Sequence, residues 1–482
     1  MFQKRVMRGF LIILVILLSL PFPWMKTREN KGNILLNEPV TDEKTDIIQI
    51  QLNLTFGGPE RDYAVEGVQT TDGGFLLAGS TESYGERDSD MWLVKINANG
   101  SVEWNQTRDI FGSDWASDLI QTKDGGFLLI GTSSIQNMLP VLYWGSAWKV
   151  FANGTEDWCQ SYYYLRSRWQ ADEHCFLNSV IQTVDGGFLL SGYTSDYFQG
   201  SRPNNLDIWL IKTFINGSVE WNQTYGSMDD RSYSVIQTID GGFLIAGETG
   251  TYGAYDEDIV LLKTYMNGSV EWNQTYGGSE SDYAISLIPT IDGGFLLAGV
   301  TNFWTNDSDI CLVKTDESGS EKWNQTYGGV KRDRPSSVIQ TAADEFLIVG
   351  TTESYGAGND DIWLVKTWAN GTIKWNQTLG GSGEEFGRSV IQTAADGFLI
   401  IGATNSYGVG DYDMWLVKLS EVKDTTTEVT IKTEEEIIPT KTISKNLSVS
   451  DSSSMFFTGF GTHLVFVIFL MELIYYKKRK KV

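Results

Sequence analysis

A repeat of about 50 residues fills most of this 482-residue chain and restricts its fold more than any other feature. The clearest copy spans residues 232–278, and two anchors recur with it between residues 47 and 419. An aspartate in an Asp-Gly-Gly-type turn recurs at Asp72, Asp124, Asp185, Asp240, Asp292, Asp344 and Asp396, for most intervals 52 residues apart. A tryptophan in Glu-Trp-Asn or a close variant recurs at Trp104, Trp158, Trp221, Trp272, Trp323 and Trp375.

Each repeat predicts four short strands, a to d. Strand a ends at the Asp-Gly turn, which tolerates the positive φ of a tight hairpin. Strand b is apolar, strand c has the form Asp-x-Trp-Leu-Val-Lys, and an Asn-Gly turn leads into strand d. One such four-stranded unit cannot bury both of its faces, but units stacked radially can, and that is the β-propeller arrangement.

The repeat count predicts how the ring closes. There are seven a–b hairpins but six tryptophan-bearing d strands, because the seventh copy stops after Lys418. The missing strand precedes the first copy, within residues 47–58, with Leu52 in the tryptophan position. Pairing of this strand with the last blade leaves no open sheet edge. We therefore predict an all-β fold, a seven-bladed β-propeller of four-stranded blades closed by the N-terminal strand.

Over residues 47–419 these motifs resemble the WD40-like and quinoprotein-like β-propellers. The chain is also similar to uncharacterised membrane-anchored surface proteins of archaea that carry the Asp-Gly-Gly-Phe-Leu-Leu-Ala-Gly signature. In quinoprotein-like propellers a glycine turn followed by tryptophan docks each blade onto the next. The resemblance implies that docking role for Trp104, Trp158, Trp221, Trp272, Trp323 and Trp375.

The two ends predict the compartment. Residues 1–25 combine basic residues with an apolar run, the pattern of a signal peptide or signal anchor. Residues 455–476 are long and apolar enough for a transmembrane helix, and the basic tail 477–482 places that end in the cytoplasm. Residues 424–454, rich in Thr, Ser and Glu, read as a disordered stalk. We expect a cell-membrane protein whose propeller is extracellular.

The charge of the central part excludes some partners. Residues 27–454 hold 28 basic and 60 acidic residues, a formal charge of −32. Nucleic acid and anionic lipid both need a basic surface, so neither is expected as a partner. The d–a and b–c loops share one rim of a propeller, and their many acidic residues could bind Ca²⁺. Alternatively, the aligned acids at the start of strand c cap turns through local backbone hydrogen bonds, and the sequence then predicts no defined metal site. These acids are Asp90, Asp207, Asp258, Asp309, Asp361 and Asp413.

The Asn-x-Ser/Thr sequon occurs 13 times. In an exported chain each copy is a candidate glycan acceptor. The c–d turns and the outer strands provide the main candidates: Asn99, Asn105, Asn153, Asn216, Asn222, Asn267, Asn273, Asn324, Asn370 and Asn376.

Blades two and three interrupt the regular pattern with a longer connection at residues 160–177. Its aromatic and charged side chains are the candidate ligand-binding residues: Tyr162, Tyr163, Tyr164, Arg166, Arg168, Trp169 and His174. The alternative is that this segment merely covers an irregular blade. Cys159 and Cys175 flank it and are candidates for a disulfide outside the cell, whereas Cys311 is expected to be buried.

Catalytic signals are absent from the sequence, and we expect no enzyme and no cofactor. The two histidines, His174 and His463, provide little material for a triad or a zinc site. The leading hypothesis is an adhesion or recognition module that binds an extracellular protein or carbohydrate. The alternatives are a structural component of the surface coat and, with less support, a carbohydrate-active enzyme that uses acidic residues of the rim.

Overall fold

The computed structural model describes residues 26–29, 47–86, 88–110, 112–135, 141–164, 173–196, 206–253, 257–393 and 397–422. All of these belong to the first of two compact units, residues 1–425. The segments predicted as signal, stalk, transmembrane helix and tail lie outside the described residues. No helix within the described ranges is long and apolar enough to span a membrane.

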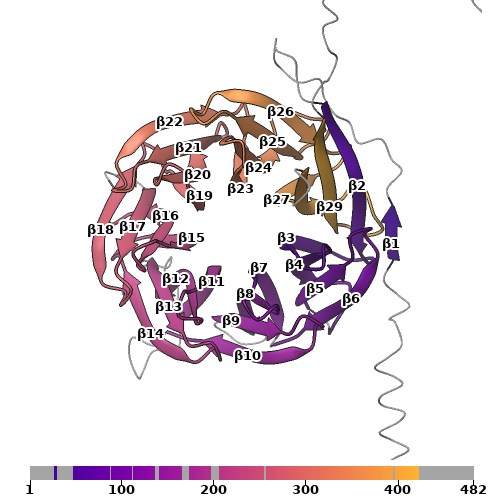
Figure 1. Cartoon of the computed structure of the whole chain (residues 1–482), viewed down its shortest axis with the longest axis horizontal. Helices are drawn as coiled ribbons and strands as arrows, with labels where there is room; N and C mark the ends of the chain where they lie inside the picture. The colour runs from indigo at the N-terminus through magenta and orange to yellow at the C-terminus, as the bar shows by residue number, and fades with distance from the viewer. Residues whose placement is uncertain are drawn as a thin grey trace, which may run out of the picture. The chain divides into compact units, whose positions relative to one another are not determined.

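Seven antiparallel sheets surround a central channel, as predicted (Figure 1). The innermost strands, at position a, are β3 (Asp62–Gln69), β7 (Ser113–Gln121), β11 (Glu173–Gln182), β15 (Asp230–Gln237), β19 (Tyr283–Pro289), β23 (Asp333–Gln340) and β27 (Glu385–Gln392). The b strands are β4 (Phe75–Thr81), β8 (Phe127–Ile135), β12 (Phe188–Asp196), β16 (Phe243–Thr249), β20 (Phe295–Thr301), β24 (Phe346–Thr352) and β28 (Gly397–Thr404).

Strands c and d complete each blade toward the outside. The c strands are β5 (Asp90–Ile96), β9 (Leu142–Val150), β13 (Leu206–Thr213), β17 (Asp258–Thr264), β21 (Asp309–Thr315), β25 (Asp361–Thr367) and β29 (Asp413–Val422). The d strands are β6 (Val102–Arg108), β10 (Glu156–Tyr162), β14 (Val219–Tyr225), β18 (Val270–Tyr276), β22 (Glu321–Tyr327), β26 (Ile373–Leu379) and β2 (Ile47–Gly57).

The N-terminal strand closes the ring, which confirms the predicted origin of the missing strand. β2 pairs with β29, and Leu52 is opposite Lys418 just as Trp104 is opposite Lys95 in blade one. A further short strand, β1 (Lys26–Glu29), pairs with the outer edge of β2 and makes this the one five-stranded sheet among the described residues. The first and last parts of the propeller therefore share one blade.

The hydrophobic core is divided among the blade interfaces. Seven clusters of buried side chains form, one between each pair of neighbouring blades. The cluster between blades four and five, for example, joins Leu261 of β17 to Leu287 and Leu297 of the next blade. The b and c strands are buried on both faces, which explains their nearly continuous apolar runs.

All six repeat tryptophans lie in these interfaces. In five of them the ring packs against the turn glycine of the next blade. A Cβ on Gly154 would lie 2.9 Å from Trp104, and one on Gly319 would lie 2.8 Å from Trp272. At the closing seam the partner of Gly100 is aliphatic, because Leu52 and Leu54 occupy that place. Trp375 is buried against the closing blade.

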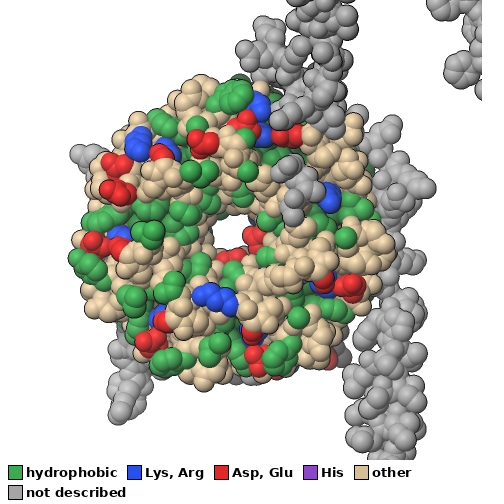
Figure 2. Space-filling model, in the orientation of Figure 1, with side chains coloured by type: hydrophobic (Ala, Val, Ile, Leu, Met, Phe, Trp, Pro, Cys, Tyr) green, Lys and Arg blue, Asp and Glu red, His purple; other side chains and the backbone are tan. Residues whose placement is uncertain are grey.

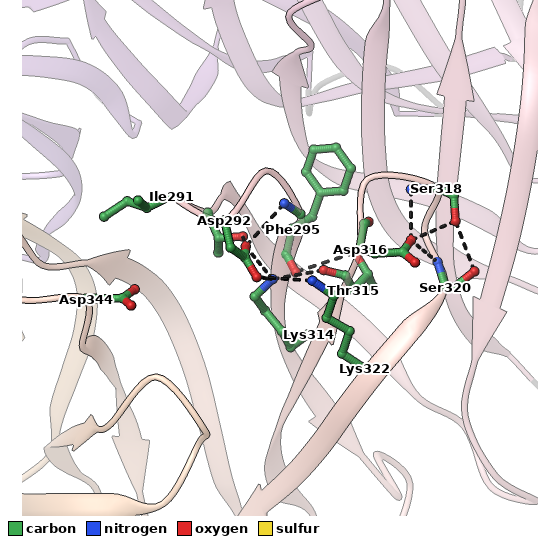
Figure 3. Close-up of polar contacts among 12 residues, drawn as sticks. Ile291, Asp292, Phe295, Lys314, Thr315, Asp316, Ser318, Ser320, Lys322 and Asp344 are labelled. Carbon is green, nitrogen blue, oxygen red and sulfur yellow. Dashed lines mark hydrogen bonds and ion pairs between the residues drawn. The ribbon is translucent and has the colours of Figure 1, made fainter.

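A buried lysine in strand c holds the a–b turn of its own blade. In blade five, Lys314 Nζ lies 2.9 Å from Asp292 Oδ1 and donates to the Thr315 carbonyl (Figure 3). The same lysine–aspartate pair occurs in four other blades, at Lys95–Asp72, Lys149–Asp124, Lys212–Asp185 and Lys263–Asp240. In blade six Glu345 replaces the turn aspartate as the partner of Lys366. A buried ammonium needs such a partner, so the Asp of this turn has a second role besides the turn itself.

Candidate functional site

A cavity occupies the central channel. It has a volume of about 590 Å³, and all seven inner strands contribute to its wall. Figure 2 shows the opening at the centre of the ring, with acidic side chains visible in its wall. Because residues of every blade converge there, the cavity is the place where the ring can present a composite binding surface.

A ring of polar side chains links neighbouring inner strands through hydrogen bonds. It consists of the residues three before the conserved strand-a glutamine or its equivalent: Glu66, Asp118, Ser179, Ser234, Ser286, Ser337 and Ser389. Several of their oxygens accept an N–H from the next blade, as with Asp118 Oδ2 and Val180 N at 2.8 Å or Ser234 Oγ and Leu287 N at 3.2 Å. Ser389 Oγ donates to Glu66 Oε1 across the closing seam.

Two carboxyl groups interrupt this serine ring in adjacent blades. Glu66 and Asp118 are half-buried by area but enclosed by the channel wall. Desolvation raises the pKa of Glu66 to about 8, and the charge of Asp118 adds to the effect. Desolvation also raises the pKa of Asp118 to about 6, although two backbone N–H groups and Ser179 favour its charged form. This part of the wall is therefore acidic but incompletely ionised at neutral pH.

Arginines and aromatic rings line another part of the cavity. Arg332, Arg334 and Arg388 come from the sixth and seventh blades. The Arg388 guanidinium lies 5.7 Å from the ring centre of Phe386, and that of Arg334 lies 5.4 Å from the ring centre of Phe303. Tyr283 packs at 4.8 Å against Phe303 and at 5.7 Å against Tyr233. We call Arg332, Arg334, Arg388, Phe386, Tyr233 and Tyr283 the arginine–aromatic site.

The three arginines of this site form no salt bridge with any residue that the structure describes. The Arg388 side chain is exposed to the channel. The protein around it still desolvates the guanidinium, which lowers its pKa. Asp360 also lines the cavity, and burial followed by the charges of Glu353 and Glu384 raises its pKa to about 6. The cavity wall thus carries three arginines together with the carboxyl groups of Glu66, Asp118, Glu353 and Asp360, and the charge of Arg334 lowers the pKa of Asp360 against those larger effects.

The sequence prediction placed the ligand site elsewhere, in the segment between blades two and three. Tyr162 is buried, and its hydroxyl donates to the Gly217 carbonyl at 2.8 Å, as the equivalent Tyr225 does to Gly268. Tyr163 is 58% exposed beside Trp144, whereas Tyr164 is half-buried against Trp209. His174 is buried next to Tyr143. Arg166, Arg168 and Trp169 lie outside the described residues, so whether this set forms one site stays a prediction.

The candidate Cys159–Cys175 disulfide is not formed in the structure. Cys159 is on β10, the outer strand of blade two, and packs toward blade one. Cys175 is on β11, the inner strand of blade three, and packs in the cluster between blades two and three. The two thiols thus belong to different interfaces. Cys311 is buried, and burial raises the pKa of its thiol to about 12.

The acids at the start of strand c cap the loop that precedes them. Asp361 Oδ2 accepts the N–H groups of Ala357 and Gly358, both at 2.9 Å, and Asp413 Oδ2 accepts that of Val409 at 2.7 Å. In Asp361 and Asp413, therefore, the Oδ2 oxygen caps the preceding loop as the local-capping interpretation predicts. The candidate sequon residues of the c–d turns make similar turns, as where Asn216 Oδ1 accepts the backbone N–H of Ser218 at 3.1 Å.

The chain was compared with known families, curated proteins and solved structures. No protein-family model matches the sequence, and no curated protein matches it either. Similar solved structures include Sqt1 from Chaetomium thermophilum, 13% identical with a TM-score of 0.40 over 75% of this chain and 97% of that chain. YCF48 bound to D1 peptide is 10% identical, with a TM-score of 0.42 over 80% of this chain and 97% of that one.

An α-L-arabinanase of Penicillium chrysogenum, complexed with arabinobiose, is 12% identical, with a TM-score of 0.40 over 64% of this chain and 94% of that one. At such identities and TM-scores the likeness assigns no activity to this chain. The sheet topology alone shows that the chain is a seven-bladed β-propeller. Its resemblance to membrane-anchored archaeal surface proteins stays a prediction.

The sequence analysis did not predict the arginine–aromatic site, because its residues occupy positions that vary from one repeat to the next. The second half of strand a is nearly constant, as in Val-Ile-Gln-Thr, whereas the first half varies among the blades. Arg334 and Arg388 both lie in that variable half. Variation inside a repeat at positions that the structure places on the channel wall is the signal that could have indicated the site.

Proposed function

We propose that this chain is a non-catalytic recognition module whose arginine–aromatic site binds a carboxylate-bearing segment of a partner protein. The observation that carries the proposal is that Arg332, Arg334 and Arg388 line one cavity without a salt bridge to any described residue. A guanidinium matches a carboxylate through two parallel hydrogen bonds, so these side chains suit an acidic ligand.

The surroundings of the arginines support this assignment. Phe386 and Tyr283 offer ring faces for the apolar part of a ligand, and the cavity of about 590 Å³ falls in the usual range of binding pockets. The strong negative charge of the whole chain would repel an acidic partner everywhere else. Recognition would therefore be confined to the cavity, which favours specificity over non-specific adsorption.

The proposed setting follows from the two ends of the sequence. An N-terminal signal segment and an apolar segment at 455–476 with a basic tail support a propeller displayed outside a membrane on a stalk. A module held there would meet partner proteins at the cell surface. This setting rests on sequence alone and concerns residues outside the described ranges.

The test is binding of the full chain to a peptide array in which each acidic peptide has a counterpart with Asp→Asn and Glu→Gln. We expect retention of a subset of acidic peptides and loss of at least tenfold in affinity for the amide counterparts. The double variant Arg334→Gln/Arg388→Gln should lose the same binding. Arg61→Gln is the matched control, because Arg61 is exposed and pairs with Asp411.

Two outcomes would overturn the proposal. Equal binding by the wild type and the double variant would remove the arginines from recognition. Binding to uronic-acid sugars on a parallel glycan array, with no acidic peptide retained, would show that the ligand class is carbohydrate. Circular dichroism of each variant establishes that the propeller is intact.

A further inference from the structure

Pairs of carboxylates face each other in the seams between blades. In the seam between blades seven and one, Asp413 at the start of strand c lies opposite Asp62 at the start of the next strand a. A Cβ added to Gly57, the residue that follows strand-d residue Phe56, would lie 1.8 Å from Asp413 Oδ1 and 2.8 Å from Asp62 Oδ2. Three other seams share this arrangement: Asp258–Asp282 at Gly277, Asp309–Asp333 at Gly328 and Asp361–Glu385 at Gly380.

The seam between blades one and two has an acidic residue where these four seams have the glycine. Its pair is Asp90 and Asp114, but the residue after strand d is Asp109 instead of glycine. Asp109 precedes Asp114 by the same five residues that separate Gly57 from Asp62, so the position is equivalent. Where four other seams need the smallest residue to make room for two carboxylates, this seam adds a third carboxylate.

The three side chains converge. Asp90, Asp109 and Asp114 each place one carboxylate oxygen so that the three atoms lie within 4.8 Å of one another. Asp90 and Asp114 are 0% exposed, whereas Asp109 is exposed and opens the cluster to water. Three like charges at such distances repel one another strongly unless a cation lies between them.

Hydrogen bonds hold the carboxylates of Asp90 and Asp114 in place, but Oδ1 of Asp90 accepts none from the described residues. Asp90 Oδ2 accepts the N–H of Glu86 at 2.8 Å, and Asp114 Oδ2 accepts that of Ile110 at 2.7 Å. Asp90 Oδ1 is buried and has no hydrogen-bond partner among the described residues. A buried carboxylate oxygen without a donor is costly, and a bound cation would supply the missing interaction. Desolvation, with the charges of Asp109 and Asp114, raises the pKa of Asp90 to about 6.

We propose that Asp90, Asp109 and Asp114 form a Ca²⁺ site that clamps blade one to blade two. The ligands are hard carboxylate oxygens, which Ca²⁺ prefers, and water on the exposed Asp109 side can complete its six to eight ligands. The ion would join the start of β5, the end of β6 and the inner strand β7, which are covalently linked only through turns. The site is separate from the arginine–aromatic site and does not depend on it.

Calorimetric titration of the full chain with CaCl₂, after removal of metal with EDTA, tests the proposal. We expect saturable binding by the wild type and at least tenfold weaker binding by Asp109→Asn. Asp109→Gly should behave in the same way, because it restores the glycine of four other seams. Asp157→Asn is the matched control, since Asp157 is an exposed carboxylate on β10 and should leave binding unchanged.

Thermal unfolding separates loss of the site from loss of the fold. In EDTA, Asp109→Asn should melt at or above the temperature of the wild type, because one of three repelling charges is gone. In millimolar Ca²⁺ the order should reverse, since only the wild type gains stability from the ion. Equal Ca²⁺ affinity in the wild type and both Asp109 variants would overturn the proposal, and so would a wild-type melting temperature that does not respond to Ca²⁺.

Discussion

The indole nitrogen of Trp415 donates a hydrogen bond to Asn53 Oδ1 at 2.7 Å, across a sequence separation of 362 residues. Trp415 is on β29, the third strand of the last blade, and Asn53 is on β2, the strand that the N-terminal part of the chain contributes to the same blade. Both side chains are buried. This contact therefore lies at the point where the ring is closed by pairing of its two ends.

Asn53→Ala should destabilise the propeller by about 1–3 kcal/mol, because it leaves the buried indole N–H of Trp415 without an acceptor. Asn273 occupies the same repeat position in blade four and is the matched control. It is exposed, and the strand-c residue there is Val260 instead of tryptophan. Chemical denaturation of Asn53→Ala and Asn273→Ala measures the difference, and equal losses would show that the bond to Trp415 contributes nothing specific.

A second prediction concerns the docking of tryptophan onto the turn glycine. Gly154 and Gly125 both have φ of +82°. Alanine at either position would have to adopt a left-handed backbone conformation, which destabilises the fold by about 1–2 kcal/mol. A Cβ on Gly154 would also meet Trp104 at 2.9 Å, whereas one on Gly125 meets nothing within 4 Å. Gly154→Ala should therefore cost about 1–3 kcal/mol more than Gly125→Ala in urea unfolding. If the two variants unfold at the same urea concentration, tight packing at Trp104 is refuted.

The architecture could be predicted because its determinants are local and repeated. The Asp-Gly and Asn-Gly turns define the strand ends in most copies, and the alignment of Leu52 with the repeat tryptophans reveals which strand completes the ring. The lysine partner of the turn aspartate was not predicted, although Lys314 and its equivalents recur as regularly as the turns. Its role becomes visible only when strand c lies beside the a–b hairpin, which puts Lys314 Nζ next to Asp292.

The sites could not be predicted because they combine residues from different blades at positions where the repeat varies. Arg334 and Arg388 are on the inner strands of neighbouring blades, and both line the channel. Asp109 was visible as an exception to the Thr-Tyr-Gly-Gly pattern, but its proximity to Asp90 and Asp114 depends on the seam between two blades. The insertion at residues 160–177 was predicted as the ligand-binding segment because of its length and its aromatic residues. Within it, Tyr162 contacts the next blade through the Gly217 carbonyl.

A last prediction concerns pH. Glu66 has a folded-state pKa of about 8, well above that of an unfolded glutamate, and Asp62 has one of about 6, both mainly through desolvation. Between the unfolded and folded pKa values the native state binds more protons than the unfolded chain, so stability falls as pH rises through this interval. Asp72 and Asp240, whose pKa values are lowered to about 2, act oppositely and lose their stabilising effect as pH falls from about 4 toward 2. For Asp72 the main cause is the hydrogen bond from Thr70, and for Asp240 it is that from Lys263.

Stability should therefore be greatest near pH 4 to 5 and decline toward pH 8, as measured by urea unfolding in EDTA. Glu66→Gln should flatten the decline between pH 5 and 8, because the neutral amide keeps the shape of the protonated acid without its titration. Asp240→Asn serves as the matched control and should change only the acidic limb, below pH 4. A Glu66→Gln profile that parallels the wild type from pH 5 to 8 would mean that Glu66 is solvated well enough in the channel to ionise at its ordinary pKa.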